Sequence, residues 1–373
     1  MPSLGETTAW LRRQQRGGAD GRSPMVMKEI ADFGENPGRL RMLSYRPANL
    51  PAKAPLVLVL HGCTQRAESF TTQAGWLTLA DRLGFVVVSP EQASANNSNR
   101  CFNWYEPVNA RRGGGEAASI AAMVAHAIAT DNLDPARVFI TGLSAGGAMT
   151  SVMLATYPEL FEAGAIVAGL PYGVAQNLGE ALGMMYSAGN RSGPQLGELV
   201  RAAAPKDARL PRVAIWHGDS DHIVRAHNAA DVASQWADAH GALEDLNRRE
   251  TLGGYSRSVW RKPDSDTVLV ESNLIRGLGH GTPLATAGPD GIGTAAPHML
   301  EAGVSSSLEI ARFWGLTTPA PDAPSAAVRK PVQTPEPPVA TLGDQVLSIT
   351  GQHVPPAVQD VIAKALKTAG LRR

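Results

Sequence analysis

The segment VFITGLSAGG (138–147) decides the fold. A short apolar run leads into Gly142-Leu143-Ser144-Ala145-Gly146, and a stretch with helical character follows at once. A Gly-x-Ser-x-Gly turn between a buried strand and a helix is typical of a nucleophile elbow, which lifts the serine hydroxyl clear of the sheet. We therefore predict that Ser144 is a nucleophile and that residues 138–147 lie at the centre of an α/β sheet.

Similar apolar runs occur on both sides of this segment and alternate with stretches of helical spacing. A short, continuous apolar run is typical of a strand buried on both faces of a parallel sheet. The runs are PLVLVLHG (55–62), FVVVSPE (85–91), ARVFITG (136–142), AGAIVAG (163–169) and RVAIWHG (212–218). Their alternation with helices predicts a mostly parallel sheet with helices on both faces.

Changes in composition suggest four regions. Residues 1–37 are polar and predict an N-terminal arm, and residues 38–316 carry the predicted catalytic domain. Residues 317–340 are rich in Pro and Ala and predict a semi-rigid linker. Residues 341–373 predict a short helical tail, and we expect residues 317–373 as a whole to be dispensable for chemistry.

The composition excludes several classes of function. Lys plus Arg and Asp plus Glu both number 34, so the net charge is zero and no electrostatic footprint for nucleic acid is expected. The sequence contains no run of 18 apolar residues, so we predict no transmembrane helix. The N-terminus lacks the apolar core of a signal peptide, which favours the cytoplasm. A chain that begins after a removed signal would look the same, so secretion stays open, as does the oligomeric state.

A serine nucleophile needs a base, and the base needs an acid that orients it. In folds with this elbow the chain order is Ser, then Asp or Glu, then His. WHGDSDHIV (216–224) continues a predicted strand and offers Asp219 and Asp221. We favour Asp221, because the apolar pair Ile223 and Val224 follows it and can hold the loop in place.

Two histidines can follow this acid as the base. His280 lies in a Gly-rich turn, RGLGHGTPL (276–284), where the last loop of the sheet is expected. His298 is the second candidate and is expected near the start of the final helix. His61 and His217 each precede a Gly at a strand end, and we interpret both as structural.

The oxyanion of a tetrahedral intermediate needs backbone N–H donors. One donor is expected from Ala145, directly after the nucleophile. The loop HGCTQ (61–65) follows another predicted strand, so the N–H of Cys63 is expected as the second. This chemistry needs no metal and no cofactor.

Together the segments VLHGCTQ, CFNW, DPARVFITGLSAGGAM, HGDSDHIV and the GHG turn resemble the polyhydroxyalkanoate (PHB) depolymerase family of esterases. That family is related to feruloyl and acetylxylan esterases, and the resemblance covers about residues 39–316. It implies an α/β-hydrolase fold and ester hydrolysis by Ser144, Asp221 and His280. It also implies that Trp104 of CFNW lines the substrate site.

The resemblance implies small esters or polyester oligomers as substrates, with short acyl chains preferred. Feruloyl or acetylxylan ester hydrolysis is the nearest alternative. Two alternatives belong to other functional classes: a serine peptidase with the same fold and a binding protein without activity.

The two cysteines are also expected to pair. Cys63 lies in the oxyanion loop and Cys101 opens CFNW, and the family resemblance makes these loops neighbours. We therefore predict a disulfide, although a reducing cytosol would keep both thiols free.

Overall fold

The computed structural model describes part of the 373-residue chain, which divides into two compact units, Met1–Thr318 and Pro319–Arg373. All described residues belong to the first unit. They are residues 25–187, 189–242, 246–262, 265–288 and 290–317. The predicted linker and tail, and most of the predicted arm, lie outside them.

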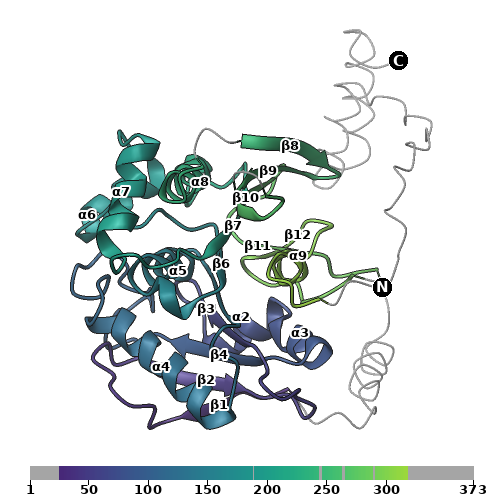
Figure 1. Ribbon diagram of the computed structural model, residues 1–373. Coiled ribbons are helices and arrows are strands. Elements are labelled where there is room, and N and C mark those ends of the chain that lie inside the picture. Colours follow the sequence, from purple (N-terminus) through teal and green to yellow (C-terminus); the bar gives the residue numbers. More distant parts are fainter. Residues whose placement is uncertain (1–24, 188, 243–245, 263–264, 289, 318–373) are drawn as a thin grey trace, which may run out of the picture. The chain divides into compact units, whose positions relative to one another are not determined.

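The described residues form a ten-stranded sheet and a separate two-stranded one (Figure 1). The order across the large sheet is β1-β2-β4-β3-β5-β6-β7-β10-β9-β8. Its strands are β1 (Lys28–Ile30), β2 (Arg41–Tyr45), β3 (Leu56–Leu60), β4 (Val86–Glu91), β5 (Val138–Leu143), β6 (Ala163–Val167), β7 (Arg212–Gly218), β8 (Leu246–Leu252), β9 (Tyr255–Arg261) and β10 (Val268–Ile275). The small sheet pairs β11 (Thr282–Leu284) with β12 (Met299–Glu301).

The strands of the centre run parallel, and those at both edges run antiparallel. From β4 through β3, β5, β6 and β7 to β10, every neighbouring pair is parallel. All residues of β3, β5 and β6 are buried, which explains why their sequences are almost continuously apolar. The mostly parallel sheet predicted from these runs is confirmed.

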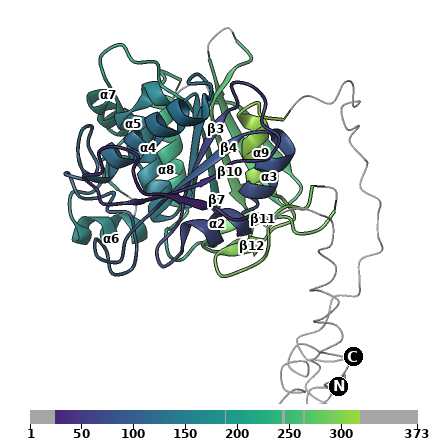
Figure 2. The same ribbon diagram turned by 90° about the horizontal axis from the view of Figure 1, so that it is seen from below.

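Helices cover both faces of the sheet, as Figure 2 shows, with α4, α5, α7 and α8 on one side and α3 and α9 on the other. The helices are α2 (Ala67–Gln73), α3 (Trp76–Leu83), α4 (Gly115–Asp131), α5 (Ala145–Thr156), the 3₁₀ turn η1 (Pro158–Leu160), α6 (Leu178–Tyr186), α7 (Gly193–Ala203), α8 (His227–Ala239) and α9 (Ser306–Phe313). None of these described helices is long and apolar enough to cross a bilayer.

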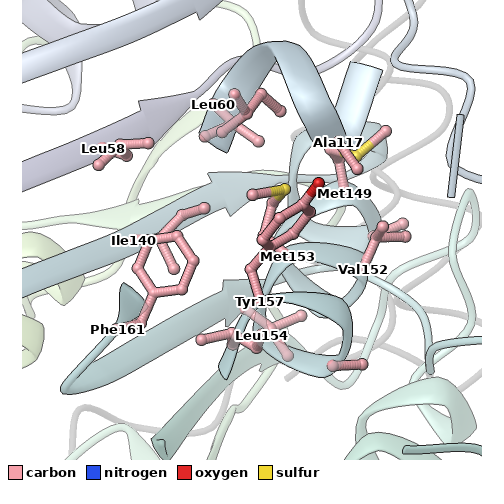
Figure 3. Close-up of a cluster of buried hydrophobic side chains, with 14 of the residues drawn as sticks. Leu58, Leu60, Ala117, Ile140, Met149, Val152, Met153, Leu154, Tyr157 and Phe161 are labelled. Carbon is pink, nitrogen blue, oxygen red and sulfur yellow. The ribbon is translucent and has the colours of Figure 1, made fainter. Parts of the chain in front are cut away.

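Each face of the sheet has its own apolar core. On one face, side chains of β3 and β5 pack against α4 and α5, and Figure 3 shows Leu58, Ile140, Met149 and Met153 in this cluster. On the other face, Trp314 stacks on both Trp76 and Phe139. Every residue of α5 is buried, so this helix is held rigidly behind the turn that precedes it.

The structure differs from the sequence-based expectation in three places. Residues 28–30, expected in an irregular arm, form an edge strand of the sheet, too short to show a periodic pattern. One of the stretches of helical spacing between the predicted strands, residues 67–83, forms two helices, α2 and α3, because Gly75 between them has φ 84°. β12 directly follows His298, and the final helix begins only at Ser306.

Candidate active site

The predicted site residues all follow strands of the parallel centre. Cys63 follows β3, Ser144 follows β5, Asp221 follows β7 and His280 follows β10. The carboxyl ends of parallel strands lie at one edge of a sheet, which is where open α/β folds bind ligands. The topology therefore brings residues far apart in the sequence to the same edge.

Ser144 occupies the sharp turn between β5 and α5. Its φ of 58° and ψ of −118° lie outside the regions that a non-glycine residue ordinarily adopts. Its N–H donates to Val167 O (2.9 Å), and its carbonyl accepts from Ala148 N (2.8 Å). Ser144 is partly exposed between buried neighbours, so the turn presents this residue at the surface.

Gly142 and Gly146 allow this turn to exist. A Cβ on Gly142 would lie 2.4 Å from Gly146 O, and a Cβ on Gly146 would lie 2.4 Å from Leu60 O. Both distances are too short for a side chain. The first turn of α5 thus lies directly against the end of β3.

His280 is bonded to Asp221. The Nδ1–H of His280 donates to Asp221 Oδ2 (2.7 Å), while Asp221 Oδ1 accepts from the N–H groups of Ile223 (2.8 Å) and Val224 (2.9 Å). Burial alone would raise the pKa of Asp221. Polar contacts with His217 and His280 outweigh that effect and hold this pKa well below its usual range.

Asp219 has a different environment from Asp221. Its Oδ1 accepts from Gly277 N (2.7 Å) and from the Ser220 hydroxyl (3.0 Å), and its N–H donates to Ile275 O (3.0 Å). Asp219 therefore fastens the loop after β7 to the loop that carries His280, and it does not contact the imidazole.

His298, the second candidate base, lies beside His280. Its Nδ1 is 3.0 Å from the backbone O of His280, and the two ring centroids are 5.7 Å apart in an edge-to-face arrangement. His298 has φ 63°, and no carboxylate of the described residues contacts its ring. Of the two candidate bases, His280 is thus the one with the aspartate partner that an oriented base requires.

The loop after β3 lies against the serine turn. A Cβ on Gly62 would be 3.5 Å from Ser144 Cβ, and His61 O borders Gly146. The N–H groups of Cys63 and Ala145 have no hydrogen-bond acceptor among the described residues. Both predicted oxyanion donors are thus uncommitted, and their role stays a prediction.

A buried polar network, missed at the sequence level, supports this loop. Gln92 N donates to His61 Nε2 (3.1 Å), and the Gln92 side chain donates to Glu116 (2.6 Å) and to Cys101 O (3.1 Å). Asn103 donates twice more to Glu116. Burial raises the pKa of Glu116 to about 7, against the effect of these hydrogen bonds. A glutamate in the first turn of a helix is so common that its sequence gives no signal of this role.

The predicted disulfide is confirmed: Cys63 and Cys101 are bonded, with their Cα atoms 4.2 Å apart. Thr64 N also donates to Asn99 O (2.6 Å), so the two loops are joined twice. Trp104, in the second loop, is buried and packs edge-on against Tyr105. Its expected role in substrate binding stays a prediction.

A cavity and possible metal-ligand groups were the other candidate features of a site. A cavity of about 1270 Å³ lies at the β1–β2 edge of the sheet, and its lining contains none of the predicted site residues. Within the described ranges, no group of three or more His, Cys, Asp or Glu side chains is arranged to hold a metal ion.

Residues 42–256 match the family described as Esterase PHB depolymerase. The chain belongs to this family. It is 40% identical over 296 residues to poly(3-hydroxyalkanoate) depolymerase C of Paucimonas lemoignei, covering 79% of this chain and 71% of that protein. It is 33% identical over 263 residues to the acetylxylan esterase of Coprinopsis cinerea, covering 69% of each chain.

A solved structure agrees in fold. The acetyl xylan esterase from Aspergillus awamori superposes with a TM-score of 0.66 at 24% identity, covering 78% of this chain and all of that one. This likeness confirms the α/β-hydrolase fold, and the family relationship establishes a carboxylic ester hydrolase. The expected enzyme class is confirmed.

The close packing at the elbow of this esterase predicts opposite effects for two Gly to Ala changes. Gly146→Ala should lower the free energy of unfolding by about 1–3 kcal/mol, because the new Cβ must push α5 away from β3. It should also reduce ester hydrolysis, since Ser144 and Ala145 move with α5. Urea unfolding and p-nitrophenyl butyrate hydrolysis measure both effects.

Gly183→Ala is the matched control, because Gly183 lies inside α6 with nothing within 4 Å of an added Cβ. That change should raise the free energy of unfolding by about 0.5–1 kcal/mol, with activity unchanged. If the two variants behaved alike, close packing at the elbow would not be the reason for Gly146.

Removing the disulfide should weaken both the fold and the site. In the chain-entropy model, Cys63→Ser with Cys101→Ser should lower the free energy of unfolding by about 3–4 kcal/mol, since the bond closes a loop with a sequence separation of 38. Urea unfolding measures the loss. Alkylation of the unreduced, denatured wild type should find no free thiol, and two reactive thiols would contradict the bond.

Proposed function

We propose that this esterase cleaves its substrate by acyl transfer through Ser144, with His280 as the base and Asp221 as the orienting acid. The observation that carries the proposal is the 2.7 Å bond between His280 Nδ1 and Asp221 Oδ2, at the edge of the sheet where the Ser144 turn also lies. The bond holds the proton on Nδ1. Nε2 is thereby left as the basic nitrogen toward the serine.

The reaction begins when Ser144 Oγ attacks the ester carbonyl carbon and gives its proton to His280 Nε2. The N–H groups of Cys63 and Ala145 donate to the oxyanion. When the tetrahedral intermediate collapses, the C–O bond to the alcohol breaks and His280 returns the proton to the leaving oxygen. Water, activated by the same nitrogen, then releases the acid and restores Ser144.

Asp221 is suited to this role because it remains a carboxylate. Its depressed pKa keeps it ionised when His280 becomes an imidazolium, so the pair gains a direct charge interaction in the transition state. The two backbone donors on Oδ1 fix the other carboxylate oxygen.

The proposed triad predicts the ranking of five substitutions. Ser144→Ala and His280→Ala should each lower kcat by about 10⁴- to 10⁶-fold and should not add, because the two residues act as one unit. Asp221→Asn should cost about 10⁴-fold, since it favours the wrong imidazole tautomer. Hydrolysis of p-nitrophenyl butyrate measures all three.

Asp219→Asn and His298→Ala are the controls. Both should be far milder, because Asp219 bonds to a loop backbone and His298 has no carboxylate partner of its own. If His298→Ala abolished activity while His280→Ala did not, the assignment of the base would be wrong.

For the substrate, we propose polyesters of hydroxyalkanoic acids. The 40% identity to a poly(3-hydroxyalkanoate) depolymerase supports this class. The alternative, acetyl or feruloyl esters of a polysaccharide, is supported by relatives of 33–34% identity. A surface feature favours the polyester, because a solid aliphatic polyester presents an uncharged, water-repelling surface.

That feature is an apolar stripe on α6, formed by Leu178, Leu182 and Tyr186. These side chains are 46–55% exposed at a spacing of four residues, while Ala181, on the neighbouring face of the helix, is buried. An exposed apolar row of this kind is a common mark of an interaction surface. Glu180, the charged residue of this helix, is bonded to Gln176 N and the Asn177 side chain.

The stripe is connected to the proposed triad. Arg225 N donates to Met185 O (2.9 Å) and the Asn228 amide donates to Met184 O (3.0 Å), which joins α6 to the segment after Asp221. The exposed Ile223, whose N–H bonds to Asp221, lies in this segment. Figure 2 shows α6 at the same end of the sheet as β11 and β12.

Polar substitution of the stripe should therefore impair polymer degradation selectively. The triple variant Leu178→Gln, Leu182→Gln, Tyr186→Gln loses apolar contact area. The ratio of its polymer-degrading activity to its p-nitrophenyl butyrate activity should therefore fall by about ten-fold. Turbidity of poly(3-hydroxybutyrate) suspensions measures the first activity. Adsorption to the polymer should fall in parallel.

Met25→Gln with Val26→Gln is the control, since these exposed apolar residues lie at the β1 edge of the sheet. An unchanged ratio in the α6 variant would refute a role for the stripe in polymer degradation. A wild type that cleaves acetylated xylan or feruloyl esters but no polyester would refute the substrate class.

The disulfide also bears on the compartment. Structural disulfides persist in oxidising surroundings and are rare in the cytosol. We propose that this esterase acts in an oxidising compartment.

A further inference from the structure

His217 lies at the end of β7 and is fully buried, and its two ring nitrogens have different surroundings. Nε2 is 2.7 Å from Val224 O and 3.4 Å from Asp221 Oδ2. Nδ1 is buried and has no hydrogen-bond partner in the described structure. The sequence places this histidine before a Gly at a strand end, which by itself suggests only a structural residue.

This asymmetry settles the protonation state of the ring. The proton must be on Nε2, where two acceptors lie, because Nδ1 faces none. A charged ring would place a second N–H in the interior without an acceptor, which is costly. His217 is therefore a neutral donor. Its N–H bonds to the Val224 carbonyl, and the same nitrogen lies 3.4 Å from Oδ2 of the proposed catalytic carboxylate.

The contact completes an enclosure around Asp221. Val224 bonds to both partners. Its N–H donates to Asp221 Oδ1, and its O accepts from the His217 imidazole. Oδ2, the oxygen that His280 binds, thus faces two imidazole rings.

We propose that His217 is a positioning residue for ester hydrolysis, which holds the Asp221 carboxylate in the plane needed for its bond to His280. This inference rests on the triad proposed above. His217 touches neither substrate nor reacting atoms. It acts on the rate through Asp221, by limiting rotation of the carboxylate and by sharing its negative charge.

Removal of the donor should have two linked effects. The carboxylate gains freedom to rotate, and a displaced catalytic group lowers kcat. Its charge, without the nearby N–H, attracts the His280 imidazolium more strongly, so the acid limb of the pH profile should move to higher pH. The other titratable groups that face this pair are His298, on the far side of the His280 ring, and Asp219, which is bonded to Gly277 in the same loop.

The experiment compares His217→Leu with His217→Gln in the full chain. Leucine removes the donor, whereas the glutamine amide places an N–H at about the reach of Nε2. Active sites are counted with a fluorophosphonate, and kcat, KM and the pH profile of kcat/KM for p-nitrophenyl butyrate are then measured per active site. His240→Leu is the control, because the ring of this partly buried histidine bonds to Pro211 O (3.0 Å) and lies beside Trp236, not beside Asp221.

We expect His217→Leu to lower kcat per site about ten-fold with KM unchanged. The acid limb of the kcat/KM profile of this variant should move to higher pH, by about 0.5 or more. His217→Gln should recover most of both, and His240→Leu should reduce stability without moving the limb.

Two results would overturn the inference. In one, His217→Leu loses active sites but keeps the kcat and the acid limb of those that remain, which would make His217 purely structural. In the other, glutamine fails to restore what leucine removes. A wild-type enzyme that is active but not labelled at Ser144 would instead refute the triad itself.

Discussion

The first turn of α5 lies against the end of β3 more closely than any side chain would permit, and the site depends on this contact. Gly146 meets the carbonyls of Leu60 and His61, and Gly142 meets Gly146. Because the backbones touch, the turn between β5 and α5 is sharp enough to expose Ser144, and the loop after β3 lies beside it. The two proposed oxyanion donors, the N–H groups of Ala145 and Cys63, belong to the two segments that this contact brings together.

The second half of the site depends on a buried charge. Asp221 is nearly inaccessible to solvent, so its carboxylate must be satisfied by the protein. The chain does so with two backbone N–H groups on one oxygen and two imidazoles at the other. Asp219, two residues earlier, fastens the neighbouring loop. The two acids of this short segment thus have different roles. Asp221 carries the buried charge beside His280, and Asp219 fixes the loop that bears His280.

Much of this arrangement could be predicted from the sequence, because the buried parallel strands and the elbow have strong local patterns. The pairing of Cys63 with Cys101 came from the family resemblance and not from any local pattern. The contacts that distinguish Asp221 from Asp219 could not be seen, since both acids lie in one loop and only their partners differ. For the same reason, the contacts of His217 and of the buried Glu116 have no signature in the sequence, because they depend on how the loops fold back on themselves.

The backbone of Ser144 has a consequence for how this enzyme can evolve. A left-handed φ at a residue with a side chain costs free energy, of order 1–3 kcal/mol, and only glycine adopts such a conformation at little cost. Replacement by glycine would thus relieve the strain and remove the proposed nucleophile in one step. Selection for thermal tolerance and selection for turnover act in opposite directions at this position. The serine marks a place where the protein gives up stability to keep its chemistry.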